Sequence, residues 1–335
     1  MKKTILLALA TLFATVTFAQ QQLATLNHND SITVYYGLSA LQQAHAAAIK
    51  GDIITLSSGV FDPVTITKAV TIRGAGAWVD TLGSLTTVRS AFTINVPNDS
   101  VYHLTLEGMY FLEAVTVQTA YNPQFIKCWF GSYMSCNSSS HIMRNAMFVN
   151  CDLNRWCNNI NNGVWQAQST QFVNSVIRDS YYDNSPDVFI NCVLQQNPTQ
   201  SYMLNRMFQN CVLYYGYNAS DCPTLNSSTA FNCIFIQKSS SSLNCANLFS
   251  GHENHTLWNK RGWNTVFKST GYYELTDAVD STCYGTDGTQ VGIYGGTMPF
   301  DPRVTNPLIK RINVAQRSTA DGKLAVDIEV VSEEE

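Results

Sequence analysis

Charge is scarce along this sequence. Lys and Arg number 20 and Asp and Glu number 24 in 335 residues, so charged residues make up 13% and the net charge is −4. An ordinary soluble domain carries about a quarter. Because no basic face can form to neutralise a phosphate backbone, we expect no nucleic-acid partner. Proline (9 residues) and glycine (19 residues) are too few for a disordered chain. The composition favours a folded, β-rich protein with amide and hydroxyl side chains on its surface.

Long apolar runs are absent after residue 20, so no transmembrane segment is predicted there. The first residues, MKKTILLALATLFATVTFAQ, place Lys2 and Lys3 before an apolar run. Small residues, Thr17 and Ala19, follow at the −3 and −1 positions of a cleavage site. This arrangement is typical of a secretory signal peptide over residues 1–19, because a membrane anchor needs a longer span. We therefore expect an exported protein.

Helix signals occur at one place only, in residues 38–50. Ser39 and Gln42 have the spacing of a capping box, and Gly51 follows as a stop signal. Leu41, Ala44 and Ala48 share one face of that helix. Residues 31–36 (SITVYY), and most of the chain from residue 52 onward, alternate apolar and polar residues in short runs, which indicates strands. The fold class expected is all-β with one short helix.

One motif recurs through the middle of the chain: Phe, any residue, Asn, Cys, then two more residues of which the last is apolar. Its Cys position is taken by Cys128, Cys151, Ser175, Cys192, Cys211 and Cys233. Lys127 replaces the Asn in the first unit, and the last unit is one residue shorter. The steps between them are 23, 24, 17, 19 and 22 residues, with a mean of 21. A period of this length with strands and no helices indicates coils stacked along an axis.

The motif has a physical reading for each position. The Phe, the Cys and the last apolar residue are expected to point into the core, and the Asn to occupy a sharp corner, since Asn tolerates left-handed backbone. Stacked amides could then hydrogen-bond along the axis as a ladder, and a buried Cys acts as a small hydrophobe. The predicted ladder comprises Asn150, Asn174, Asn191, Asn210 and Asn232, with Cys128, Cys151, Cys192, Cys211 and Cys233 beside it.

With the helix before the first coil, the opening coil GDIITLSSGVFDPVTITKAVTIRGAG and the Phe-x-Asn-Cys coils, the chain resembles the right-handed parallel β-helix proteins of the pectin-lyase-like superfamily, and their secreted Bacteroidetes members in particular. The resemblance implies a right-handed, single-stranded parallel β-helix over residues 20–300, capped by the helix at 38–50. Such a scaffold carries many activities, so it implies no particular one.

Two further cysteine pairs have nearly the coil spacing. Cys136 and Cys157 are 21 residues apart, and Cys222 and Cys245 are 23 apart. Each pair would be within disulfide reach on adjacent coils, or would remain as free thiols if insertions shift the register. No metal site is predicted, because no CxxC motif and no Cys–His cluster occurs.

The chain ends differently, in residues 301–335. Before them, residues 285–302 are rich in glycine and turn signals. Residues 309–318 and 324–332 then flank the sequence TADGK, which predicts a β-hairpin followed by an acidic tail. The hairpin either caps the open end of the β-helix, where strand edges would otherwise aggregate, or forms a small attachment module.

Motifs for catalysis are missing. The resemblance implies Asp-Asp and Gly-His-Gly motifs for a hydrolase and an Arg or Lys base for a lyase, and the first two do not occur. Counting back from each Cys places Met143 and Ala167 inward on the preceding strand, so their neighbours should face outward. The candidate glycan-binding face consists of Arg144, Gln166, Gln168, Asp183, Asp187, Tyr202 and Arg206.

These observations lead to three hypotheses. The first is a non-catalytic glycan- or surface-binding protein, adhesin-like, secreted or held at the cell surface. The second is a polysaccharide lyase acting on an acidic glycan, with Arg144 or Arg206 as base, and only this one would call for calcium. The third is an inert structural stalk. The partner expected is a polysaccharide or a cell-surface glycan, with no cofactor, and the chain is expected to be a monomer.

Overall fold

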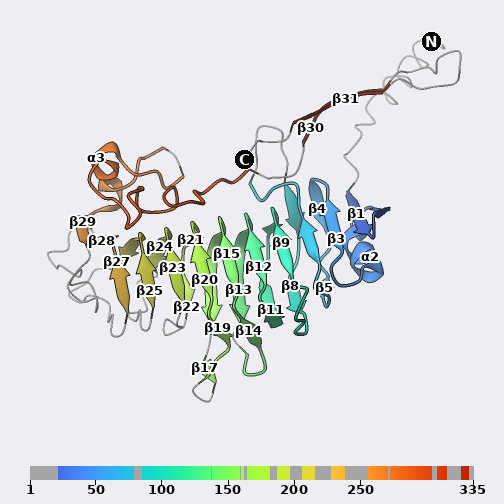
Figure 1. Cartoon of the computed structure of the whole chain (residues 1–335), viewed down its shortest axis with the longest axis horizontal. Coiled ribbons are helices and arrows are strands. Elements are labelled where there is room, and N and C mark those ends of the chain that lie inside the picture. Colours follow the sequence, from blue (N-terminus) through green and yellow to red (C-terminus); the bar gives the residue numbers. More distant parts are fainter. Residues whose placement is uncertain are drawn as a thin grey trace, which may run out of the picture. The chain divides into compact units, whose positions relative to one another are not determined.

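The computed structural model describes residues 22–78, 85–136, 138–158, 160–161, 164–181, 187–196, 206–215, 228–237, 256–270, 272–303, 308–314 and 326–331. These residues form two compact units, one ending at Pro302 and one beginning at Arg303. The larger unit is a parallel β-solenoid, whose strands stack side by side in Figure 1. The helices are short: α2 (Ala40–Ala47), α3 (Asp277–Asp280) and the 3₁₀ turn η2 (Trp263–Thr265).

Two sheets make up the solenoid. The first has eleven strands, in spatial order β2 (Ser31–Tyr36), β1 (Leu23–His28), β3 (Ile53–Leu56), β6 (Thr71–Arg73), β9 (Thr105–Glu107), β12 (Gln124–Ile126), β15 (Met147–Val149), β20 (Gln171–Val173), β23 (Val188–Ile190), β25 (Met207–Gln209) and β27 (Thr229–Phe231). From β3 to β27 all pairings are parallel, and β1 and β2 add antiparallel strands at the N-terminal end.

The second sheet has sixteen strands. They are β4 (Gly59–Phe61), β5 (Thr65–Ile66), β7 (Thr86–Val88), β8 (Phe92–Asn95), β10 (Tyr110–Phe111), β11 (Val115–Tyr121), β13 (Trp129–Cys136), β14 (Ile142–Arg144), β16 (Asp152–Asn158), β19 (Ala167–Gln168), β21 (Val176–Ile177), β22 (Ser180–Tyr181), β24 (Val193–Gln196), β26 (Val212–Tyr215), β28 (Cys233–Gln237) and β29 (Leu257–Arg261). A small hairpin of β17 (Ile160–Asn161) and β18 (Val164–Trp165) lies beside it.

The recurring motif builds the core as predicted. Phe125, Phe148, Phe172, Phe189 and Phe208 pair in register across the first sheet. Their rings stack with centroids 4.6 to 5.3 Å apart, and all five are fully buried. The last coil departs from this pattern: Ala230 takes the core position opposite Phe208, and Phe231 lies one position later.

The asparagines occupy left-handed corners, which confirms their predicted role. All five have φ between 45° and 55°, and Lys127 holds the same corner one coil earlier with φ 49°. An amide-to-amide bond along the axis is present between Asn210 and Asn191, at 3.2 Å. Asn174 and Asn232 instead donate to carbonyl groups of a later segment. The asparagines therefore repeat the same backbone conformation along the axis, whereas amide-to-amide hydrogen bonds between them are not the rule.

The thiols beside the corners also hydrogen-bond. The Sγ atom of Cys211 accepts the Cys192 N–H at 3.4 Å and donates to the Phe189 carbonyl at 3.3 Å, both on the preceding coil. Ser175 substitutes directly, because its Oγ atom accepts the Cys151 N–H at 3.0 Å. Each thiol thus serves the backbone of its neighbour as well as filling the core.

Cys136 and Cys157 do not form the suggested disulfide; both are free, as are the thiols of the corner row and Cys283. The reason is register. The pairing of β13 with β16 shifts between Phe130 and Tyr133, so that Ser135 lies opposite Cys157 and Cys136 lies opposite Asn158. Residues one apart on a strand point to opposite faces. Cys222 and Cys245 lie outside the described residues.

The N-terminal helix is shorter than predicted. It covers Ala40–Ala47, and Leu41, Ala44 and Ala48 are buried as expected. The capping box does not form: the Gln42 amide donates to the Pro63 carbonyl at 2.8 Å, and Gln43 contacts the Ser39 hydroxyl at 2.9 Å. The helix ends at Ala47 because Ala48 turns to extended backbone with ψ 154°.

The segment after β29, residues 263–302, is called the strap below. Figure 1 shows this orange segment running back along the coils. The carbonyl of Tyr284 accepts from the Asn232 amide at 3.0 Å, and the carbonyls of Ile293 and Gly295 accept from Asn174 at 2.8 and 2.7 Å. Its glycines permit this approach, since a Cβ atom on Gly296 would lie 2.7 Å from the Asn191 amide nitrogen.

The strap buries the outer face of the second sheet. Val176, Val193, Val212 and Ile234 pair in one row, and all are fully buried. They form a second core with strap residues such as Val266, Phe267, Val291 and Ile293. The glycine-rich residues therefore belong to a cover along the solenoid. The predicted hairpin exists as β30 (Leu308–Val314) and β31 (Val326–Val331), in the second unit, and its capping role stays a prediction.

A buried ion pair fastens the strap. Asp152 is fully buried, and the Arg178 guanidinium donates to its two oxygens at 3.0 and 2.5 Å. The Tyr272 hydroxyl of the strap donates to the same carboxylate. Burial and the negative charge of Asp152 raise the pKa of the Tyr272 hydroxyl, so this phenol stays protonated as a donor.

Removing Arg178 should therefore cost more than removing an exposed arginine. We expect Arg178→Met to lower the free energy of unfolding by about 3 kcal/mol, because it leaves the Asp152 charge buried and uncompensated. Arg155→Met is the matched control. Arg155 donates to Asp179 at 2.7 Å but is 46% exposed, and its loss should cost under about 1 kcal/mol. Urea unfolding measures both; equal losses would contradict the fastening role.

The thiols give a second prediction. Burial raises the pKa of Cys136 to about 12 and of Cys157 to about 11, so the native protein should react slowly with a thiol reagent at neutral pH. After unfolding without a reductant, titration should find at least the eight thiols described as free. Fewer than eight would show that a disulfide forms among them.

Candidate functional site

Most described residues of the predicted glycan-binding face are buried or hydrogen-bonded within the solenoid. The inward row is confirmed, since Met143 and Ala167 are opposite each other and fully buried. Arg144 and Gln168 are opposite each other beside that row. However, the Arg144 guanidinium donates to the carbonyls of Met143 and Gln166, at 2.8 and 2.7 Å. Gln166 is only 6% exposed.

Two charged residues of that face are inside the solenoid, so their predicted outward orientation is wrong. Asp187 is 1% exposed and Arg206 is 2% exposed. Asp187 accepts the indole N–H of buried Trp156 at 3.0 Å, and the Arg206 guanidinium lies 5.5 Å from the Phe189 ring centroid. Both directly precede a strand of the first sheet, at the position where Thr170 is also buried. Asp183 and Tyr202 lie outside the described residues.

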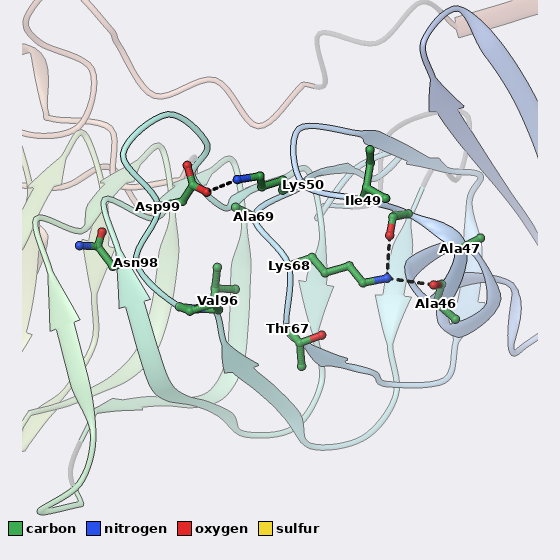
Figure 2. Close-up of a pocket in the computed structure, with 12 residues that line it drawn as sticks. Ala46, Ala47, Ile49, Lys50, Thr67, Lys68, Ala69, Val96, Asn98 and Asp99 are labelled. Carbon is green, nitrogen blue, oxygen red and sulfur yellow. Dashed lines mark hydrogen bonds and ion pairs between the residues drawn. The ribbon is translucent and has the colours of Figure 1, made fainter.

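A groove of about 520 Å³ opens instead at the N-terminal end of the solenoid. Figure 2 shows three segments around it: the end of α2, the residues after β5 and the residues after β8. Alanines, Val96 and Pro97 provide its apolar surface. Thr67, Asn98, Asp99 and Lys50 provide the polar groups at its margin.

One lysine of the groove, Lys68, is hydrogen-bonded to backbone carbonyls. Its ammonium group donates to the carbonyls of His45, Ala46 and Ala48 at 2.8, 2.9 and 2.6 Å. Figure 2 shows the bond to Ala46. These carbonyls end the helix and have no partner within it. A positive charge at a helix C-terminus is also favourable electrostatically. Lys68 therefore builds the groove wall, and its three donors are engaged.

The margin carries an ion pair between Lys50 and Asp99, at 2.8 Å. The other oxygen of Asp99 accepts the backbone N–H groups of Val101 and Tyr102, at 2.9 and 3.0 Å. Hydrogen bonds from Lys50 and then from these two N–H groups hold the pKa of Asp99 well below its usual range. The Lys50 ammonium lies 5.6 Å from the Tyr102 ring centroid. The pair is thus charged and open to solvent, with Lys50 61% exposed.

A glycine makes this arrangement possible. Gly51 has φ +89°, which a side chain would strain, and the Tyr102 ring packs against it. A Cβ atom there would lie 2.5 Å from the ring. Lys50 and Asp99 are 49 residues apart in sequence, so no local pattern announces their pairing. The turn signal after β8, Pro97-Asn98-Asp99-Ser100, was the one visible clue.

The groups that line the groove are suited to binding a ligand. Its apolar surface can accept the carbon faces of a ligand, and its amide, hydroxyl, ammonium and carboxylate groups can pair with polar substituents. In the described ranges no group of three or more His, Cys, Asp or Glu side chains is placed to hold a metal ion. Among the same residues, no helix is long and apolar enough to cross a membrane.

Comparisons with protein-family models, with curated proteins and with solved structures found no match. The parallel β-solenoid is therefore shown by the structure alone.

His45, a residue of α2 next to the groove lining, should make stability depend on pH. This residue is 5% exposed, and its Nε2 atom accepts the Thr67 N–H at 3.2 Å. Burial, and then the charge of Lys68, lower its pKa from 6.5 to about 4. The unfolded chain binds this proton at higher pH than the folded one, so His45 makes stability fall as pH drops from about 6.5 to about 4.

His45→Gln keeps an acceptor for Thr67 but cannot titrate. We expect wild-type protein to lose about 2 kcal/mol more than His45→Gln between pH 7 and pH 4. His103→Gln serves as control for a histidine elsewhere. Parallel pH profiles for wild type and His45→Gln, measured by urea unfolding, would contradict the burial of a neutral imidazole.

Proposed function

We propose that this chain is an exported, non-catalytic glycan-binding protein with an adhesin-like role at a cell surface, and that the groove is its sugar site. The signal-peptide pattern of residues 1–19 supports export. The resemblance to secreted β-helix proteins of the pectin-lyase-like superfamily in Bacteroidetes supports the same setting. The site moves from the face suggested by sequence to the N-terminal end of the solenoid.

The observation that carries the proposal is the composition of the groove. A sugar ring has carbon faces that pack on apolar surface and hydroxyl groups around its edge that need hydrogen-bond partners. The groove combines both kinds of surface, with Ala47, Ala69 and Val96 beside Lys50, Asn98 and Asp99. Its volume of about 520 Å³ is within the range of small-molecule sites and suits one or two sugar units.

The ion pair at the margin favours a glycan over a purely apolar ligand. Asp99 is held ionised, so its carboxylate accepts hydrogen bonds at every physiological pH. Lys50 offers a donor that is already oriented by Asp99 and Tyr102. Hydrogen bonds to charged groups are stronger than those between neutral groups. A glycan carrying a carboxylate would gain further from Lys50.

Binding is favoured over lyase chemistry by where the arginines lie. A lyase base must reach the proton that it removes from its substrate. Arg206 is 2% exposed, and Arg144 donates to two backbone carbonyls. These placements count against the two arginines suggested as bases, and the groove counts against an inert stalk.

The proposal predicts glycan binding that depends on the groove. The purified protein is titrated with acidic and neutral oligosaccharides by calorimetry. Ala47→Trp should fill the groove without burying new surface in the core, since Ala47 is exposed. Lys50→Met should remove the oriented donor. We expect each to weaken binding by about tenfold or more, as the loss of a charged hydrogen bond implies.

Lys268→Met is the matched control. Lys268 is 41% exposed and pairs with Asp277 at 3.2 Å, on the strap. It should bind glycan like wild type. Binding that survives both groove variants would place the site elsewhere, and new unsaturated uronate products, followed by absorbance, would make the protein a lyase.

A further inference from the structure

The strand β2 ends the first sheet and is open on one side. In the described ranges it pairs with β1 alone. Three of its alternate residues are apolar and exposed: Ile32 at 67%, Val34 at 39% and Tyr36 at 56%. Leu38, just after the strand, is 40% exposed. An open strand edge beside apolar side chains is a site where another strand can add.

The second sheet ends in a charged strand. The second sheet ends at β29, which carries Lys260 and Arg261. Charges on an edge strand prevent pairing with other chains. From Ser31 to Leu38 there is neither a charge nor a proline. The β2 edge therefore lacks the charges that protect the β29 edge.

We propose that the partner of β2 is the same strand of a second copy of this chain, joined antiparallel about a two-fold axis. The sheet is already antiparallel at this end, since β3, β1 and β2 alternate in direction. A further antiparallel strand would therefore continue the sheet with the pairing it already has at this end. Two copies of one strand pair antiparallel by two-fold symmetry, which is the commonest symmetry of protein dimers.

The residue pattern of β2 fits itself. If the axis passes at Val34, this residue lies opposite its own copy, and Ile32 lies opposite Tyr36 of the partner subunit. Facing pairs of apolar or aromatic residues stabilise antiparallel strands. The nearest charge, Asp30, would lie opposite an uncharged Leu38, and the two Asp30 side chains would be at opposite ends. No like charges meet, so the pairing has no electrostatic penalty.

The dimer would join two solenoids at their N-terminal ends and would carry two grooves. The inference does not rest on the proposed function, because it follows from the strand edge alone. It departs from the monomeric state expected from the sequence. Within β2 the pairing about Val34 covers five residues per copy, 32–36, which is small for an interface. We therefore expect an equilibrium between one and two chains in the micromolar range.

The test is the mass in solution over a series from micromolar to hundreds of micromolar protein, by light scattering or sedimentation. Val34→Lys places a charge opposite its own copy at the axis, and Tyr36→Lys places a charge opposite the apolar Ile32 of the partner subunit. Each should raise the dissociation constant by at least about tenfold. Tyr133→Lys is the matched control for Tyr36→Lys. Tyr133 is 41% exposed on β13, which has strands on both sides. Thermal melts confirm that each variant folds.

Backbone hydrogen exchange gives a second readout. In the dimer, amides of β2 should exchange more slowly as protein concentration rises, while those of β29 should not change. A concentration-dependent dimer that is lost in both β2 variants and kept in Tyr133→Lys supports the proposal. A wild-type protein that stays monomeric throughout would overturn it. So would a dimer that survives both β2 substitutions, since its interface would lie elsewhere.

Discussion

The left-handed corner at the end of each first-sheet strand is the constraint on which the solenoid depends. The corner residue donates its N–H to the next coil, as Lys127 does to Val149 and Asn150 to Val173, at 2.9 and 3.1 Å. Corners therefore stack, and the residues around them fall into rows. The last coil shows which requirement dominates. Its motif is one residue shorter, and Asn232 keeps the corner while Ala230, not Phe231, enters the core. The corner, with φ near 50°, keeps its Asn even in the shorter motif, because Asn tolerates this backbone conformation. The core position, in contrast, accepts a residue smaller than Phe.

The same corners connect the two cores of the larger unit. Asn174 and Asn232 face out of the corner and bind strap carbonyls, so the strap lies over the second sheet and buries the row from Val176 to Ile234. Asp152 stands at the equivalent position one coil earlier, and its charge is compensated by Arg178. Apolar burial supplies the attraction along most of the strap. The Asp152 site favours one position of the strap, because the buried carboxylate needs a hydrogen-bond donor and Tyr272 of the strap provides one.

Both proposed functional surfaces lie at the N-terminal end, where the repeat stops. The groove exists because α2 ends early and because loops after β5 and β8 close around it. The free edge of β2 exists because two antiparallel strands precede the first coil. Within regular coils, polar side chains hydrogen-bond to neighbouring coils, as Arg144 does with Gln166 and Asp187 does with Trp156. Recognition therefore falls to the end of the scaffold, where polar groups such as Lys50 remain exposed.

The parallel stack, the inward rows and the corner asparagines followed from the sequence, because each depends on local spacing and on the conformational preference of one residue type. The strap did not, since Asn174 meets Ile293 across 119 residues. One local clue existed: Val193-Leu194, Val212-Leu213 and Ile234-Phe235 are adjacent apolar pairs, which indicate a strand buried on both faces. The sequence left a Cys136–Cys157 bridge and free thiols as alternatives, and a register shift in β13 that moves one partner by one residue decides for the free thiols. Asp187 and Arg206 were misplaced because the position directly before each of these first-sheet strands is buried, as it is for Thr170. The Lys50–Asp99 pair depended on tertiary structure alone, because Gly51 and the turn at Asp99 meet only when the first coils stack.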